Sequence, residues 1–275
     1  MNQIIETKKV LIGWPSINGE LLLAGNNYAL LTTNLKEQVQ KAIASVQSRS
    51  VYTNQGDVIS EPAPELEQYI NQFWQKDESD PFKNQGWAIK IADLNKVCSI
   101  QPFVECKSSV EKTKEINQNN LIRIAEISLP ISKPQSLLPS FDPVKKAWVF
   151  SSPNPNLKLL QPYTNQNTIF EFVVGIPNSF VQVVKCKERY FVRDGYHRAY
   201  GFMANGISKI PILYREFNSF NEMGLSSGFF PNEILMSDHP PMLTDFFNDK
   251  VSGIAQFTQS LKVVLIQGLE INTFG

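Results

Sequence analysis

The stretch YFVRDGYHRAYGFMANGISKIPILY, residues 190–214, constrains the fold more than any other part of the chain. Its first apolar run leads into Asp194–Gly195, a tight turn that glycine permits because it tolerates backbone angles that other residues avoid. From Tyr196 onward apolar side chains recur at helical spacing, and Gly206 stands where helices commonly end. The apolar run 210–213 then predicts another strand. The stretch is therefore expected to form a strand–turn–helix–strand unit.

The start of this helix has the chemistry of an anion site. The first turn of a helix presents unpaired N–H groups and about half a positive charge, which favours bound anions. We expect the anion to be bound by Gly195, Tyr196, His197 and Arg198. His197 and Arg198 add side-chain donors at the start of the helix, where a positive charge would be unfavourable without a bound anion. Asp194 and His197 are the candidate catalytic residues, Asp194 as a base or Mg²⁺ partner and His197 as a hydrogen-bond donor.

A plainer interpretation of the same residues is equally open on physical grounds. In it Asp194 is only a helix cap, His197 is a half-buried imidazole with its hydrogen bonds satisfied, and Arg198 belongs to a surface ion pair.

The run Asp194–Arg198, with a hairpin before it and a glycine-ended helix after it, resembles the signature of the ParB/sulfiredoxin superfamily. The resemblance spans roughly residues 181–213. This superfamily contains partition proteins that bind and hydrolyse CTP, ATP-dependent sulfiredoxins, free-serine kinases and ParB-like nucleases. The resemblance implies that the turn binds nucleotide phosphates, with ATP or CTP and Mg²⁺ as the expected ligands. It also implies phosphoryl transfer or nucleotide hydrolysis as the reaction, if the protein is an enzyme.

Departures from the family pattern narrow these options. Tyr196 stands where sulfiredoxins carry their reactive cysteine, so the protein is not expected to be a sulfiredoxin. In partition proteins and kinases of the family an acidic or Asn–Pro/Arg-containing segment upstream completes the nucleotide site, and the segment 131–143 contains no arginine. The tail after Tyr214 does not resemble the DNA-binding helix-turn-helix of partition proteins. A non-catalytic interaction module that binds a protein partner through residues 1–110 is therefore the alternative function, and a nuclease acting on DNA is a third option.

Charge and composition exclude other classes of function. The 275 residues carry 26 basic and 26 acidic side chains, and a net charge of zero argues against coating DNA or an anionic membrane. No apolar run approaches the roughly 20 residues that cross a bilayer, and the N-terminus lacks signal-peptide features, so a cytoplasmic location is expected. Cys98, Cys106 and Cys186 have no paired spacing and predict free thiols. Two lone histidines, His197 and His239, do not predict a metal site.

The remaining patterns predict an α+β fold in two parts. A polar stretch at 107–120 predicts a junction between a mixed region, residues 1–110, and a ParB/sulfiredoxin-like domain, residues 111–275, that carries the anion site. Pro211 favours an edge or strand-start position. Within 10–33 the Asn18–Gly19 pair predicts a strand-rich start with a hairpin. The other expected elements are helices at 35–47 (capped by Asn34), 64–74 and 241–247, and strands at 87–91, 97–104, 169–174, 180–185, 190–193 and 262–267.

Overall fold

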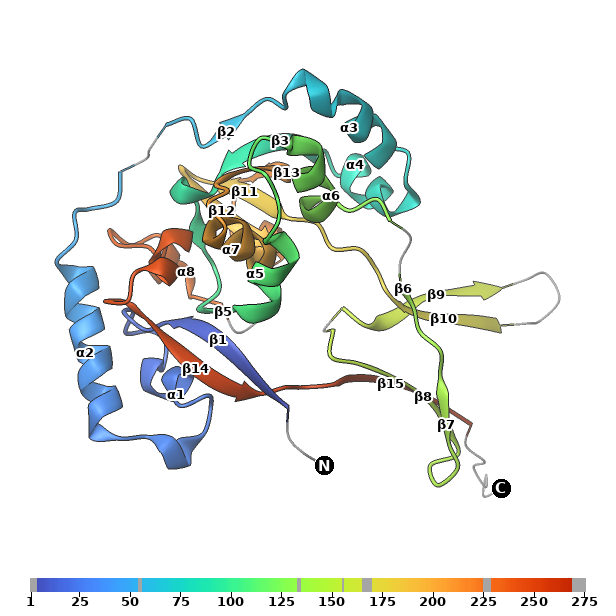
Figure 1. The fold of residues 1–275 in the computed structure, drawn as a ribbon, viewed down its shortest axis with the longest axis horizontal. Coiled ribbons are helices and arrows are strands. Elements are labelled where there is room, and N and C mark those ends of the chain that lie inside the picture. Colours follow the sequence, from blue (N-terminus) through green and yellow to red (C-terminus); the bar gives the residue numbers. More distant parts are fainter. Residues whose placement is uncertain are drawn as a thin grey trace. The chain divides into compact units, whose positions relative to one another are not determined.

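The structure is a computed structural model and describes residues 4–53, 56–132, 135–154, 156–164, 170–224 and 229–268 (Figure 1). It confirms the α+β class, because helices and several sheets are both present. The chain forms two compact units, and the division differs from the expected one at residue 110. Unit 1 is made of Met1–Ile131 and Phe180–Thr258, and unit 2 of Ser132–Ser179 and Gln259–Gly275.

Unit 1 is built around a mixed sheet of six strands in the order β2–β3–β13–β11–β12–β4. Pairs β11–β13 and β12–β4 are parallel, and the other neighbours are antiparallel. The predicted hairpin between β11 and β12 is confirmed. The strands are β2 (Ile59–Ser60), β3 (Ala88–Asp93), β4 (Cys98–Ser99), β11 (Gln182–Cys186), β12 (Arg189–Asp194) and β13 (Lys209–Phe217).

Strand β13 lies inside this sheet, so the edge alternative for Pro211 is wrong, and Pro211 lies near the start of β13. The N–H of Leu213 donates to the carbonyl of Val181, 2.9 Å away on the β11 side, and position 211 faces the same way by strand alternation. Strand β11 begins only at Gln182, which pairs with Leu213. Pro211 therefore lies beyond the start of β11, where its missing N–H leaves no bond of the ladder unmade.

A second sheet of unit 1 joins distant parts of the sequence in the order β14–β1–β5 (Figure 1). Its strands are β1 (Ile5–Leu11), β5 (Phe103–Glu105) and β14 (Ser252–Thr258). The hairpin expected at Asn18–Gly19 is wrong, because the Asn18 side chain accepts a hydrogen bond from the Leu21 N–H (2.9 Å) and caps helix α1 (Gly19–Leu23). Asparagine is favoured in both roles, and here it begins a helix.

The helices predicted in the first half of unit 1 are present, with shifted starts. Helix α2 (Thr33–Gln47) begins after Thr32, whose hydroxyl accepts from the Leu35 N–H (3.3 Å), and not after Asn34 as predicted. The helix predicted at 64–74 is a 3₁₀ turn, Pro64–Leu66, followed by α3 (Glu67–Phe73). The shorter helices are α4 (Asp80–Asn84) and α8 (Asn232–Leu235), and the predicted helix near 241–247 is the 3₁₀ turn Leu243–Phe247.

The polar stretch predicted as a junction is part of the unit 1 fold. Its first half forms helix α5 (Lys107–Thr113), which lies beside helix α7 (Tyr196–Ala204) (Figure 1). A Cβ on Gly201 of α7 would stand 2.2 Å from the carbonyl oxygen of Ser109, so glycine is what permits this close crossing. Helix α6 (Leu121–Ser128) follows and leads out of the first segment of unit 1.

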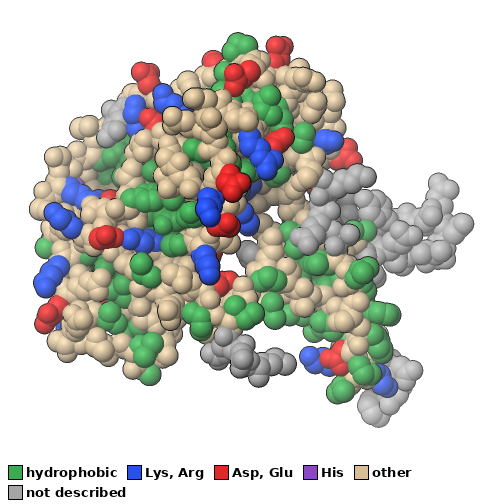
Figure 2. Space-filling view, viewed as in Figure 1, with side chains coloured by type: hydrophobic (Ala, Val, Ile, Leu, Met, Phe, Trp, Pro, Cys, Tyr) green, Lys and Arg blue, Asp and Glu red, His purple; other side chains and the backbone are tan. Residues whose placement is uncertain are grey.

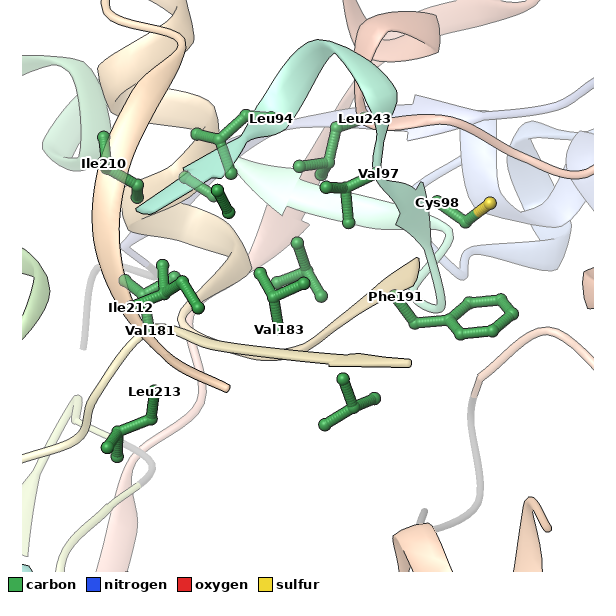
Figure 3. Close-up of a cluster of buried hydrophobic side chains, with 14 of the residues drawn as sticks. Leu94, Val97, Cys98, Val181, Val183, Phe191, Ile210, Ile212, Leu213 and Leu243 are labelled. Carbon is green, nitrogen blue, oxygen red and sulfur yellow. The ribbon is translucent and has the colours of Figure 1, made fainter. Parts of the chain in front are cut away.

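The main core of unit 1 packs the six-stranded sheet against its helices and loops. Figure 3 shows buried side chains gathered between the sheet and the segments beside it, among them Val183 of β11, Ile212 of β13, and Leu94 and Val97 after β3, with Leu243 from the C-terminal part of unit 1 beside them. Cys98 and Cys186 are buried here, and all three cysteines are free, as expected. On the face drawn in Figure 2, acidic and basic side chains are interspersed and not separated by sign. No helix in the part of the chain that the structure describes is long and apolar enough to span a membrane.

Unit 2 consists of two small antiparallel sheets, ordered β6–β10–β9 and β15–β8–β7. A separate apolar cluster, with Phe150, Leu157, Val174 and Ile176 buried, holds it together. The predicted strand at 262–267 is confirmed, and the one at 169–174 is confirmed from Phe170, since Ile169 lies outside the described residues. The strands are β6 (Gln135–Ser136), β7 (Ser140–Asp142), β8 (Ala147–Ser152), β9 (Lys158–Thr164), β10 (Phe170–Ile176) and β15 (Lys262–Gln267).

Candidate functional site

The turn between β12 and α7 adopts the predicted strand–turn–helix geometry. Gly195 has φ +75°, in the left-handed region, and is the residue before the first turn of α7. A Cβ at this position would lie 2.7 Å from the Cα of Val181, which belongs to the chain entering β11. Both the backbone angle and the space therefore require glycine.

No side chain caps the first turn of α7. The first backbone hydrogen bond of the helix runs from the Ala199 N–H to the Gly195 carbonyl (2.9 Å). The N–H groups of residues 196–198 consequently have no partner within the helix. Asp194 does not act as the cap, because its Oδ1 accepts from the neighbouring Gly195 N–H (2.6 Å).

His197 links this helix to the other sheet of unit 1. Its Nδ1 accepts a hydrogen bond from the backbone N–H of Glu105 in β5 (2.9 Å). Burial lowers the pKa of His197 to about 4, with the charge of Glu105 opposing the shift and that of Lys8 adding to it. The imidazole is therefore neutral at pH 7, and because Nδ1 is an acceptor, its proton is on Nε2.

Arg198 points back toward the end of α6. Its guanidinium Nη1 donates to the carbonyl of Ile127 (3.0 Å). Burial lowers the pKa of Arg198 to about 10, and the charge of Asp194 opposes this, so Arg198 remains a cation at neutral pH. Burial also raises the pKa of the Asp194 carboxyl, against the Gly195 N–H and the two nearby arginines. Arg198 and Asp194 therefore stabilise each other electrostatically within the turn.

Tyr196 is also partly buried at the turn. Burial raises the pKa of its hydroxyl, and a hydrogen bond with Gln101 works in the opposite direction. The rings of Tyr196 and His197 meet edge to face, with centroids 4.5 Å apart. The side-chain oxygen of Gln101 is buried and has no hydrogen-bond partner among the described residues. The hydrogen bond with Gln101 and the ring contact with His197 together position the side chain of Tyr196.

Arg193 supplies a second positive charge beside the turn. Its Nε donates to the carbonyl of Met223 (2.7 Å), its Nη1 donates to the side-chain oxygen of Gln182 (2.5 Å), and its guanidinium lies over the ring of Trp87. Within residues 193–198, two arginines and one aspartate leave one net positive charge, because the histidine is neutral. The helix dipole adds to this charge, so the turn favours an anion.

The structure thus brings the five predicted site residues together, but it assigns two side chains to contacts that the sequence did not reveal. His197 bonds a strand edge 92 positions away, and Arg198 bonds a carbonyl 71 positions away. The interpretation of His197 as a half-buried imidazole with its hydrogen bonds satisfied is therefore confirmed for Nδ1. His239 lies elsewhere: its backbone carbonyl accepts from the indole of Trp14 (2.8 Å).

Metal binding has little support from side chains alone. Among the described residues there is no cluster of three or more histidine, cysteine, aspartate or glutamate side chains that could hold a metal ion. Asp194 is the one carboxylate within the five-residue turn, so any Mg²⁺ here would need most of its ligands from a bound phosphate and water. Comparison with protein-family models, with curated proteins and with solved structures finds no match to this chain.

Proposed function

We propose that the protein binds a nucleotide, through its phosphate groups, at the turn Asp194–Arg198. The observation that carries the proposal is the uncapped first turn of α7, which follows a glycine whose backbone angle and surroundings disfavour any other residue and lies beside two arginines. The backbone N–H groups of Tyr196 and His197 at the start of α7 precede the first hydrogen bond of the helix, and the positive end of the helix dipole would favour a phosphate oxygen beside them. The resemblance of this run to the ParB/sulfiredoxin signature supports the same ligand class.

The contacts of the side chains revise the roles expected of them. Arg198 supplies positive charge near Asp194, while its Nη1 donates to the Ile127 carbonyl. His197 contributes the Nε2–H as a neutral donor, since Nδ1 is engaged with Glu105 and no partner of Nε2 is present among the described residues. The ligand is therefore held mainly by backbone N–H groups and one imidazole N–H.

The proposal extends to phosphoryl transfer or nucleotide hydrolysis with Asp194 as the base. A carboxylate whose pKa is raised by burial holds a proton more readily than an exposed one, which suits a group that accepts a proton from water or a hydroxyl. Mg²⁺ would be held by the ligand phosphates, with Asp194 as the carboxylate of the turn that could bind it. ATP and CTP are the first nucleotides to test.

Substitution of His197 by asparagine separates the structural and ligand roles of this side chain. Asparagine oxygen replaces the Nδ1 acceptor, so the bond from Glu105 is kept, while the Nε2–H donor is removed. Calorimetric titration with ATP, CTP and inorganic phosphate, each with and without Mg²⁺, should show binding that weakens about tenfold or more in His197→Asn, the effect of losing one hydrogen bond to a charged group. His239→Asn is the matched control and should bind like the wild type.

Two results would contradict the proposal. If none of these ligands binds the wild type, the turn is structural and the interaction-module alternative takes its place. If Asp194→Asn binds nucleotide and hydrolyses it at the wild-type rate, the catalytic extension fails while the binding proposal stands.

A further inference from the structure

Unit 1 contains a groove that the proposed function does not use. It lies beside the start of β3, where this strand extends past the end of β2. It has a volume of about 620 Å³ and lies between the start of β3 and the helices α3 and α4, which are drawn together in Figure 1. Ile70 and Trp74 of α3, Lys83 of α4 and Ile89 of β3 line it. All of these residues belong to one compact unit, so the groove is fixed by the packing of that unit.

The backbone of β3 is open toward this groove. The Asp93 N–H donates to the Val58 carbonyl (2.9 Å), which shows that this residue of β3 turns its hydrogen-bonding groups toward β2. Because these groups alternate along a strand, Ile91 and Ile89 point the same way. Ile91 pairs with Ser60, the last residue of β2. Ile89 is therefore the next position that a longer β2 would pair with.

No other part of the described chain takes that place. Pro62, which lines the groove next to the end of β2, has no N–H to give. On the other side of Ile89, the Trp87 N–H is bonded to the carbonyl of Phe82 (3.1 Å). The N–H and C=O of Ile89 have no partner on this side among the described residues. The open edge is therefore one residue pair long, with the pair Ile91–Ser60 at one end and the hydrogen bond between Trp87 and Phe82 at the other.

The walls next to this open edge combine apolar surface with an unused donor. Ile89 and Trp87 are buried side chains of the sheet, and Ile70 and Trp74 face them from α3 as partly buried ones. The indole N–H of Trp87, a residue only 6% exposed, is buried and has no acceptor in the described part of the chain. A buried donor without an acceptor is unfavourable, and a group entering the groove would relieve it by offering a carbonyl or carboxylate oxygen.

Charges at the rim favour a negative group. Lys90 is already paired with Glu61. Lys83 is exposed on the surface and forms no ion pair with a described residue. The groove therefore carries one uncompensated positive charge, at the α4 side.

We propose that this groove binds an extended peptide segment of a partner protein, which adds to β3 as a short strand. Its central residue would exchange two hydrogen bonds with Ile89 and place an apolar side chain beside Ile70 and Trp74, on the face that Ile89 occupies. An acidic side chain next to it would lie near Lys83. An open strand edge favours a peptide over a small molecule, because only a peptide backbone offers a donor and an acceptor at strand spacing.

The test uses the full chain and a displayed library of random peptides, selected on the wild type and counter-selected on Lys83→Glu. Enriched peptides should share an apolar residue next to an acidic one. A synthetic peptide of the enriched sequence should shift the NMR signals of the Trp87 indole N–H and the Ile89 amide. It should bind Lys83→Glu about tenfold more weakly, the effect of losing one charge-assisted contact. The exposed Lys36→Glu on α2 is the matched control and should leave the affinity unchanged.

Three outcomes would overturn the proposal. One is a library that yields no sequence preferring the wild type over Lys83→Glu. Another is a peptide that binds without changing the Trp87 and Ile89 signals, which places it elsewhere. The third is protection of the Ile89 amide that rises with protein concentration in the absence of peptide, which would make a second copy of this chain the occupant. None of these outcomes depends on whether the turn at 194–198 binds nucleotide.

Discussion

Replacing Gly195 with alanine tests the geometry of the turn most directly. An alanine at φ +75° occupies the left-handed region, which costs about 1–2 kcal/mol for a residue with a Cβ. The same Cβ would lie 2.7 Å from the Cα of Val181, and forced contacts of this kind cost about 1–3 kcal/mol more. We therefore expect Gly195→Ala to lower the free energy of unfolding by about 2–5 kcal/mol, measured by urea denaturation.

Two other glycines separate these contributions. Gly206 has φ +79° and nothing within 4 Å of its would-be Cβ, so Gly206→Ala should show the backbone cost alone, about 1–2 kcal/mol. Gly201 lies within α7, where a Cβ would meet the Ser109 carbonyl at 2.2 Å. Gly201→Ala should therefore show the contact cost, about 1–3 kcal/mol, less the roughly 1 kcal/mol by which alanine favours a helix over glycine.

The comparison of Gly195→Ala with Gly206→Ala shows whether the contact with Val181 adds to the cost of the backbone angle. If Gly195→Ala lowers stability no more than Gly206→Ala does, the close approach of Val181 to the turn is refuted. The uncapped first turn of α7 would then not be held in the geometry that the proposed function requires.

Three further predictions follow from contacts elsewhere in unit 1. The pKa of His197 is about 4 in the folded state and about 6.5 in the unfolded state, so the unfolded state binds the proton first as the pH falls. The free energy of unfolding should therefore fall by about 3 kcal/mol between pH 6.5 and pH 4. The variant His197→Asn, which keeps the hydrogen bond from Glu105, should not show this loss in thermal melts recorded across that pH range. Burial raises the pKa of the Cys98 thiol to about 12 and also raises that of the less buried Cys106. A thiol reagent at pH 8 should therefore label Cys106 first and Cys98 only when the protein unfolds, and equal labelling rates for the two thiols would contradict this. Asn205→Ala should cost about 1–3 kcal/mol in denaturation, since its Nδ2 bonds α5 to α7, and an unchanged midpoint would refute that role.

The sequence predicted the segment from the β11–β12 hairpin to β13 well, because every signal in it is local. Gly195 and Gly206 are both in the left-handed region, as turn glycines should be, and the apolar spacing between them predicts α7. The edge alternative for Pro211 was wrong because a proline shows only that one N–H is absent. Whether a neighbouring strand extends far enough to need that N–H depends on the register, and here β11 begins only opposite Leu213.

Other features depend on contacts that no local pattern carries. The polar composition of 107–120 predicted a junction, yet Ser109 and Thr113 within it are buried because α7 offers a glycine at the crossing. Asn18 satisfied the pattern of a hairpin and of a helix cap equally. Among the site residues, positions were predictable from the turn signal, but the partner of His197 was not, because nothing near Glu105 in the sequence indicates a strand edge that needs an acceptor.

The pairing of β1 with β14 has a consequence for the order of events during synthesis. Residue pairs in this ladder run from Ile5 with Thr258 to Leu11 with Ser252, so the first strand of unit 1 must wait for the last strand of unit 1. Contacts so far apart in sequence slow folding, because a long loop must close before they stabilise the chain. While a ribosome is still making residues 12–251, one edge of β1 therefore has no strand beside it. Until β14 emerges, the unpaired edge of β1 is open to pairing with other strands, and a holdase chaperone that covers it should be released once β14 has been made.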